Sequence, residues 1–167
     1  MAIDRFLGFL SRARYPKKFA IFYLLDEKSL LSGAIRHKVG PYEMIVPADE
    51  FYFWKVCGPK NYQKKRVYRF AKILNSLESK FALFDCGADI GTVSVLIRWL
   101  CPNVQEIIAF EPNPNSFSYL CNNLQRLNIP NRAINAGVSN TDGFANFTFS
   151  TGKGSVTRPH GWYRSLV

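Results

Sequence analysis

The stretch that decides the fold is FALFDCGADIG, residues 81–91. Its first four residues are apolar, as expected for a short strand that is buried on both faces of a sheet. Asp85, Gly87 and Gly91 then follow the expected carboxyl end of that strand. Glycine permits a tight turn and leaves room for a ligand beside the backbone. The pattern therefore predicts a ligand-binding loop that joins a strand to a helix.

Strands and helices alternate downstream of this loop, which predicts a parallel sheet with right-handed crossovers. We expect an α/β, Rossmann-like fold with helices on both faces of the sheet, preceded by a mixed helical and strand segment. The expected elements are a helix at 92–100, a strand at 106–110, a helix opened by Asn113-Pro114, a strand at 132–136 and, after an Asp142-Gly143 turn, a strand at 144–149.

Charged residues and a helix start at the ends of these elements favour a nucleoside ligand. Glu111 follows the second strand, 20 residues after Gly91, where a carboxylate can accept hydrogen bonds from both ribose hydroxyls. The start of the helix after Gly91 favours an anionic group, and Asp85 can meet a cationic one. Asp89 stands where a dinucleotide site needs a second glycine, so the spacing disfavours NAD and FAD.

Two motifs resemble those of the FkbM-type methyltransferases, namely DCGADIG at 85–91 and FEPNP at 110–114. The resemblance extends over about residues 40–150, and it implies S-adenosyl-L-methionine as the cofactor. Asp89 departs from the pattern, because the family usually has asparagine there. Carried over by position, the resemblance implies cofactor contacts at Asp85, Gly87, Gly91 and Glu111, with Ser139 or Asn140 near the adenine.

The basic charge is concentrated in the N-terminal half. The chain has 167 residues and a net charge of +10; residues 1–80 hold 16 Lys and Arg against 7 Asp and Glu, a net of +9. We expect this segment to pack on a cofactor-binding half at 81–150, followed by a loop-like tail at 151–167. Within the basic segment we expect helices at 4–14 and 61–79, a strand at 42–46, and helix or strand at 19–25 and 51–56.

The function that the resemblance implies is O-methylation of a hydroxyl on a sugar or a secondary metabolite, with a small-molecule or glycan acceptor. The sequence identifies no catalytic residue, because neither His37 nor His160 has a spacing that suggests a base. Strands expected after the third are missing, so the domain is expected to be truncated at its C-terminus. The alternatives are a truncated, non-catalytic relative and a basic module that makes weak contact with an anionic membrane surface.

Cysteine usage and hydropathy bear on the compartment. The cysteines at positions 57, 86, 101 and 121 lack the spacing of a metal site, so no metal is expected. With no signal peptide and no long apolar run, we expect reduced thiols in a cytoplasmic protein. Aromatic and basic residues are not interleaved in a pattern typical of nucleic-acid binding, and no nucleic-acid partner is expected.

Overall fold

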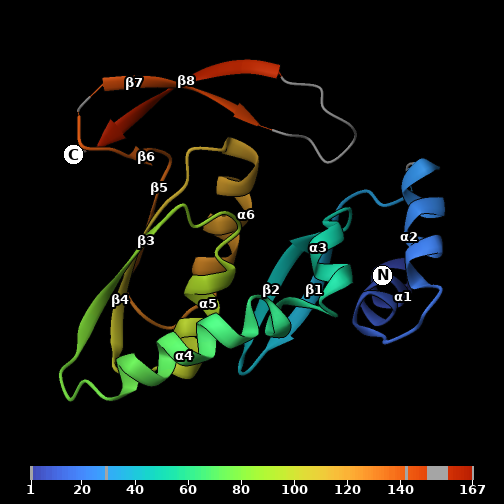
Figure 1. Ribbon diagram of the computed structural model, residues 1–167, viewed down its shortest axis with the longest axis horizontal. Helices are drawn as coiled ribbons and strands as arrows, with labels where there is room; N and C mark the ends of the chain where they lie inside the picture. The colour runs from blue at the N-terminus through green and yellow to red at the C-terminus, as the bar shows by residue number, and fades with distance from the viewer. Residues whose placement is uncertain (1, 29, 142, 150–157, 167) are drawn as a thin grey trace.

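The computed structural model describes residues 2–28, 30–141, 143–149 and 158–166. Figure 1 shows the arrangement of its helices and strands. In chain order they are α1 (Ala2–Arg12), α2 (Lys18–Glu27), β1 (Ala34–Val39), β2 (Tyr42–Pro47), α3 (Phe51–Lys55), the 3-10 helix η1 (Pro59–Asn61), α4 (Lys64–Asn75), β3 (Phe81–Cys86), α5 (Thr92–Leu100), β4 (Val104–Phe110), α6 (Pro114–Leu124), β5 (Asn131–Ile134), β6 (Gly137–Val138), β7 (Gly143–Phe149) and β8 (Arg158–Leu166).

The central sheet has the order β3-β4-β5, and both of its pairings are parallel. Helices α5 and α6 make the two crossovers, so the expected α/β class and parallel sheet are confirmed. The expected helix at 92–100 coincides with α5. The Asn113 side chain caps α6 by accepting a hydrogen bond from the backbone N–H of Asn115, at 3.0 Å. The ambiguous segments at 19–25 and 51–56 contain helices α2 and α3.

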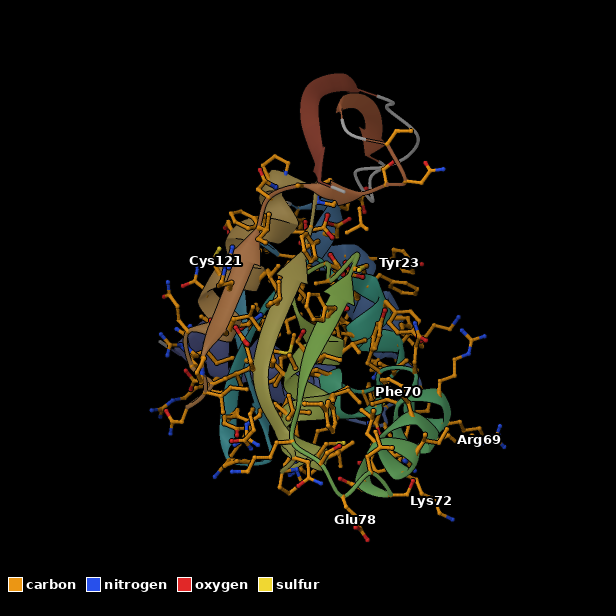
Figure 2. All side chains as sticks on the ribbon, turned by 90° about the vertical axis from the view of Figure 1, so that its left-hand side faces the viewer. Tyr23, Arg69, Phe70, Lys72, Glu78 and Cys121 are labelled. Atoms are coloured by element: carbon orange, nitrogen blue, oxygen red, sulfur yellow. The ribbon has the colours of Figure 1, made fainter. Side chains whose placement is uncertain are left out.

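Helices cover the sheet on one face in the described residues. Leu83 on β3 and Ile107 on β4 are neighbours in register and are buried toward α5. Phe84 points to the opposite face and is 62% exposed. Figure 2 shows the three strands from this open side, with α5 and α6 behind them. After β5 the chain continues into a second small sheet.

The second small sheet has the order β6-β8-β7, and its strand β8 replaces the expected loop over residues 158–166; residues 151–157 and 167 lie outside the described part of the chain. β8 pairs antiparallel with β7 and parallel with β6. Pro159 and Gly161 made a strand improbable from the sequence, but β7 and β6 supply backbone partners on both sides of β8. The expected strand at 144–149 is confirmed as β7, whereas Asp142 of the expected turn lies outside the described residues.

The N-terminal segment packs through the β1–β2 hairpin on helices α5 and α6. Met44 and Val46 of β2 belong to the same buried cluster as Leu96 of α5 and Leu120 of α6. A second cluster, around Trp54, holds α1, α2 and α3 together. Helix α4 lies against α5. The hydrophobic core is therefore shared between the N-terminal segment and the sheet.

Asn123 connects the hairpin, α6 and the loop after β3. The residue is fully buried. Its amide group accepts a hydrogen bond from Ile45 N–H at 2.7 Å and donates to Ile45 O at 2.9 Å and to Ile90 O at 2.8 Å. Two of these bonds extend the edge of β2 as a neighbouring strand would. One side chain thus satisfies backbone groups that burial would otherwise leave unpaired.

Helix α1 buries only part of its apolar side, on which Phe6, Phe9 and Leu10 follow the spacing i, i+3, i+4 with Leu7 beside them. Leu7 and Leu10 are buried against the protein, whereas Phe6 is 56% and Phe9 65% exposed. Burial follows the pair of leucines because α1 packs on β1 and α3 along that side. The phenylalanines are left facing solvent. Among the described helices, none has both the length and the apolar character needed to cross a membrane.

His37 on β1 is buried, with 2% of its surface exposed. Within the described part of the chain, its Nδ1 atom has no hydrogen-bond partner. Burial, and secondarily the positive charge of Arg12, lowers the pKa of His37 to about 4. The imidazole is therefore neutral in the folded protein at neutral pH, and it belongs to the core rather than to a site.

We predict that His37 stays neutral until the pH approaches 4. Because a histidine in the unfolded chain titrates near 6.5, protonation favours unfolding, and stability from this group is lost as the pH falls from 6.5 to about 4. NMR titration of the imidazole resonances in a His160→Asn variant, which leaves one histidine, measures the pKa directly. A midpoint near 6.5 would contradict the buried position.

We predict that Asn123→Ala destabilises the fold by about 2–4 kcal/mol, since it leaves buried backbone groups of Ile45 and Ile90 unpaired. Urea unfolding followed by circular dichroism measures the change. Asn122→Ala is the matched control, because the Asn122 side chain is exposed and bonds only within its own helix. Equal losses of unfolding free energy in both variants would show that Asn123 does not hold the hairpin, α6 and the loop after β3 together.

Candidate functional site

The loop after β3 is shaped by three residues with positive φ, namely Gly87 (82°), Asp89 (50°) and Gly91 (82°). The backbone N–H groups of Gly87 and Ala88 both donate to Phe110 O, at 2.9 Å each. This pairing holds the loop against the end of β4. Aspartate and asparagine tolerate the left-handed region better than other side-chain-bearing residues, which suits position 89.

The two glycines have different surroundings. A Cβ atom built on Gly87 meets no atom within 4 Å, so the turn faces open space. A Cβ atom on Gly91 would lie 2.9 Å from Leu120 Cδ1 of α6. Gly91 therefore serves the close packing of α5 and α6, whereas Gly87 leaves room beside the backbone.

Glu111 is buried at the end of β4, and its carboxylate joins two loops. Oε2 accepts a hydrogen bond from the N–H of Asp89 at 2.8 Å, and Oε1 accepts one from the N–H of Asn113 at 2.7 Å. An ionised carboxylate has about four acceptor positions. Two of them remain for a ligand, and the side chain is held in place before any ligand arrives.

Asp85 lies at the end of β3, beside α5. Its Oδ2 accepts a hydrogen bond of 2.6 Å from the Ser94 hydroxyl. Burial raises the pKa of Asp85 above its usual range, and the hydrogen bonds from Ser94 oppose that rise. A cationic group placed beside this carboxylate would replace the solvation that burial removes.

A family comparison decides what kind of site this is. Residues 85–160 match the model of the methyltransferase FkbM domain. Over these residues the chain is similar to the FkbM methyltransferase domain. The search of curated proteins found no match to the chain. The match begins at Asp85, so the resemblance of residues 40–84 to the family's entry segment stays a prediction.

The matched segment contains a further polar residue beside Glu111 that the sequence analysis did not identify. The Asn135 amide, directly after β5, donates to Glu111 O at 2.7 Å and to Pro112 O at 3.2 Å. Its place after a strand, like those of Asp85 and Glu111, is the signal that could have identified it. The three strand ends of the sheet therefore each carry a polar residue at the same edge.

Ser139 and Asn140 lie beyond β6 and are exposed. The Ser139 hydroxyl accepts a hydrogen bond from the N–H of Thr141 at 3.3 Å. Both residues follow β5 and β6 in the chain. Among the described residues, neither is hydrogen-bonded to Glu111. Their position near an adenine ring stays a prediction.

A pocket adjoins the glycine loop on the side of the N-terminal segment. Its volume is about 680 Å³. Asp89 contributes the wall on the side of the loop, and α3, η1 and the start of α4 contribute the rest. The lining includes Glu50, Tyr52, Tyr62, Gln63, Lys64 and Asp89.

Proposed function

We propose that the protein is an S-adenosyl-L-methionine-dependent O-methyltransferase. The observation that carries the proposal is the Glu111 carboxylate, which is fixed by two backbone N–H groups beside an open glycine turn inside an FkbM domain. A buried carboxylate at the end of a second parallel strand is suited to bind a ribose diol. The FkbM family implies a methyl donor. S-adenosyl-L-methionine is a methyl donor that carries a ribose, which suits a ribose-binding carboxylate.

The residues present fit the cofactor. Gly87 leaves open space where a ligand can approach the backbone, and Glu111 retains acceptor positions for two hydroxyls. Asp85 would hold the ammonium group. Thr92, at the start of α5, has a buried hydroxyl without a hydrogen-bond partner among the described residues. This hydroxyl and the helix start suit the cofactor's carboxylate.

When bound, S-adenosyl-L-methionine supplies an electrophilic methyl group on sulfur. A hydroxyl oxygen of the acceptor takes the methyl group, the carbon–sulfur pair stays with sulfur, and the hydroxyl gives up its proton. The protein's part is to align the two molecules and to accept that proton. We propose a sugar or a secondary metabolite as the acceptor, in line with the resemblance of the motifs, and no nucleic-acid substrate.

We propose the cytoplasm as the compartment. The proposal is supported by the cysteines at positions 57, 86, 101 and 121, which are all free thiols. Cys101 is buried and Cys86 is exposed. Free thiols are kept reduced in the cytosol, whereas secreted proteins of this size more often pair them.

We predict that Glu111→Gln lowers the affinity for S-adenosylhomocysteine at least tenfold, which corresponds to about 1.4 kcal/mol. The amide can keep only one of the two backbone hydrogen bonds and donates where the ribose needs an acceptor. Isothermal titration calorimetry on the full chain measures the dissociation constant, and a thermal melt checks that the variant is folded.

Glu106→Gln is the matched control, because Glu106 lies on β4, the strand that leads to Glu111, and precedes Glu111 by five residues. Its affinity should equal that of the unmodified protein. Unchanged affinity in the folded Glu111→Gln variant would overturn the ribose assignment. No binding to the unmodified protein would overturn the proposed cofactor.

A second candidate function is weak attachment to an anionic membrane surface through the N-terminal helices. The observation that favours it is the solvent-facing pair Phe6 and Phe9 on α1, with Arg5 and Arg12 on the same helix. Further exposed apolar side chains on this part of the molecule are Tyr15, Tyr23, Leu24 and Leu30. Aromatic side chains beside arginines suit the headgroup region of an anionic bilayer.

We predict that the chain floats with vesicles of phosphatidylserine and phosphatidylcholine at low salt, and that Phe6→Ser with Phe9→Ser abolishes flotation. The apolar contact is lost while the charge is kept. Phe70→Ser with Ile73→Ser is the control, since these side chains are exposed on α4. Absence of flotation at low salt, or equal losses in both double variants, would rule out attachment through α1.

A further inference from the structure

We propose that the pocket between α3 and the start of α4 binds the methyl acceptor, and that the acceptor is a hydroxylated ring bearing a phosphate or carboxylate group. The inference rests on the proposed methyl transfer. It names residues outside the matched FkbM segment at 85–160, because most of the pocket lining comes from the N-terminal segment. The acceptor site and the cofactor site would then belong to different parts of the chain.

The pocket shares the glycine loop with the cofactor residues. Asp89 lines the pocket, and its own backbone N–H donates to the Glu111 carboxylate at 2.8 Å. A molecule in the pocket therefore lies against the loop that also carries Gly87 and Gly91, the positions expected to contact the cofactor. Two substrates that must react need this kind of proximity.

Aromatic side chains form one wall of the pocket. The Tyr62 ring lies 5.4 Å from the Tyr52 ring, edge-on, and is stacked at 5.7 Å on the Phe53 ring. Phe53 is buried, so it anchors the other two rings. Such a preformed apolar surface suits the face of a flat aromatic ring or of a sugar ring.

Three consecutive basic residues, Lys64, Lys65 and Arg66, line the pocket where α4 begins. All three are exposed. No acidic residue and no capping side chain accompanies them in this first turn. Cations at a helix N-terminus oppose the helix dipole, so their arrangement weakens the helix while it concentrates positive potential at the pocket. An anionic group on the ligand would relieve that repulsion.

Glu50 supplies a carboxylate for the acceptor hydroxyl. Its Oε1 accepts a hydrogen bond from Tyr52 N–H at 3.2 Å, which leaves Oε2 without a hydrogen-bond partner among the described residues. Burial raises the pKa of Glu50, and the negative charges of Asp89 and Asp49 raise it further, against the opposing Tyr52 hydrogen bond. A carboxylate with raised proton affinity is suited to accept the hydroxyl proton.

Binding of defined probes tests the proposal on the full chain saturated with S-adenosylhomocysteine. The probes are glucose 6-phosphate and 3,4-dihydroxybenzoate, with glucose and catechol as their uncharged counterparts. We expect at least one anionic probe to bind at least tenfold more tightly than its counterpart, and the one that binds distinguishes a sugar from an aromatic acceptor. No preference for either anionic probe would overturn the proposal.

Two sets of variants locate the binding. Lys65→Gln with Arg66→Gln should weaken the anionic probe at least tenfold. Arg69→Gln with Lys72→Gln, which removes two cations of the same helix that do not line the pocket, should leave it unchanged. Figure 2 shows Arg69 and Lys72 extending from α4 into solvent. Equal effects of the two double variants would show that only the overall charge matters and would overturn the site.

Glu50→Gln tests the hydroxyl contact. We expect it to weaken the hydroxylated probe at least fivefold and to leave unchanged the binding of benzoate or inorganic phosphate, which lack ring hydroxyls. An equal loss for both kinds of probe would remove Glu50 from that role. The affinity for S-adenosylhomocysteine, measured separately, should be unchanged in all pocket variants. A loss of that affinity in the variants would assign the pocket to the cofactor instead. If the unmodified protein does not bind S-adenosylhomocysteine, that result contradicts the proposed function alone.

Discussion

The three hydrogen bonds of Asn123 are the constraint on which the arrangement of the two halves depends. They attach helix α6 to β2 and to Ile90, the residue before the second glycine of the loop. The hairpin, the helix and the loop therefore cannot move independently without unpairing buried backbone groups. Because α3 and α4 follow the hairpin in the chain, the N-terminal wall of the pocket is positioned against the loop by the same side chain.

The site is held by backbone hydrogen bonds more than by pairs of side chains. The Glu111 carboxylate accepts hydrogen bonds from two N–H groups, and the Asn135 amide donates hydrogen bonds to two carbonyl groups. The carbonyl oxygen of Phe110 accepts hydrogen bonds from the N–H groups of Gly87 and Ala88. Such bonds position the carboxylates at the ends of the strands before a ligand is present, which lowers the entropic cost of binding. Further charged groups near the loop are Asp85, Glu50 and the basic residues at the start of α4.

The sequence predicted the parts of the fold that depend on local signals. The motif at 85–91 sets its own backbone turn, and the Asn113 side chain caps a backbone N–H two residues ahead, so both can be recognised without knowledge of tertiary contacts. The direction in which α1 faces, the strand β8 and the pocket around Glu50 depend on partners distant in sequence. The apolar residues of α1 form one wide arc of the helix, and only packing on β1 and α3 selects the leucines for burial.

The left-handed backbone at Asp89 has a consequence for how related proteins diverge. Only glycine, asparagine and aspartate adopt this conformation at little cost, so the position has a short list of acceptable residues. Exchanging aspartate for asparagine preserves the loop shape and removes one negative charge next to Glu50. Replacing one carboxylate oxygen of Asp89 by an amide nitrogen thus changes the electrostatic potential of the pocket while the shape of the loop is kept.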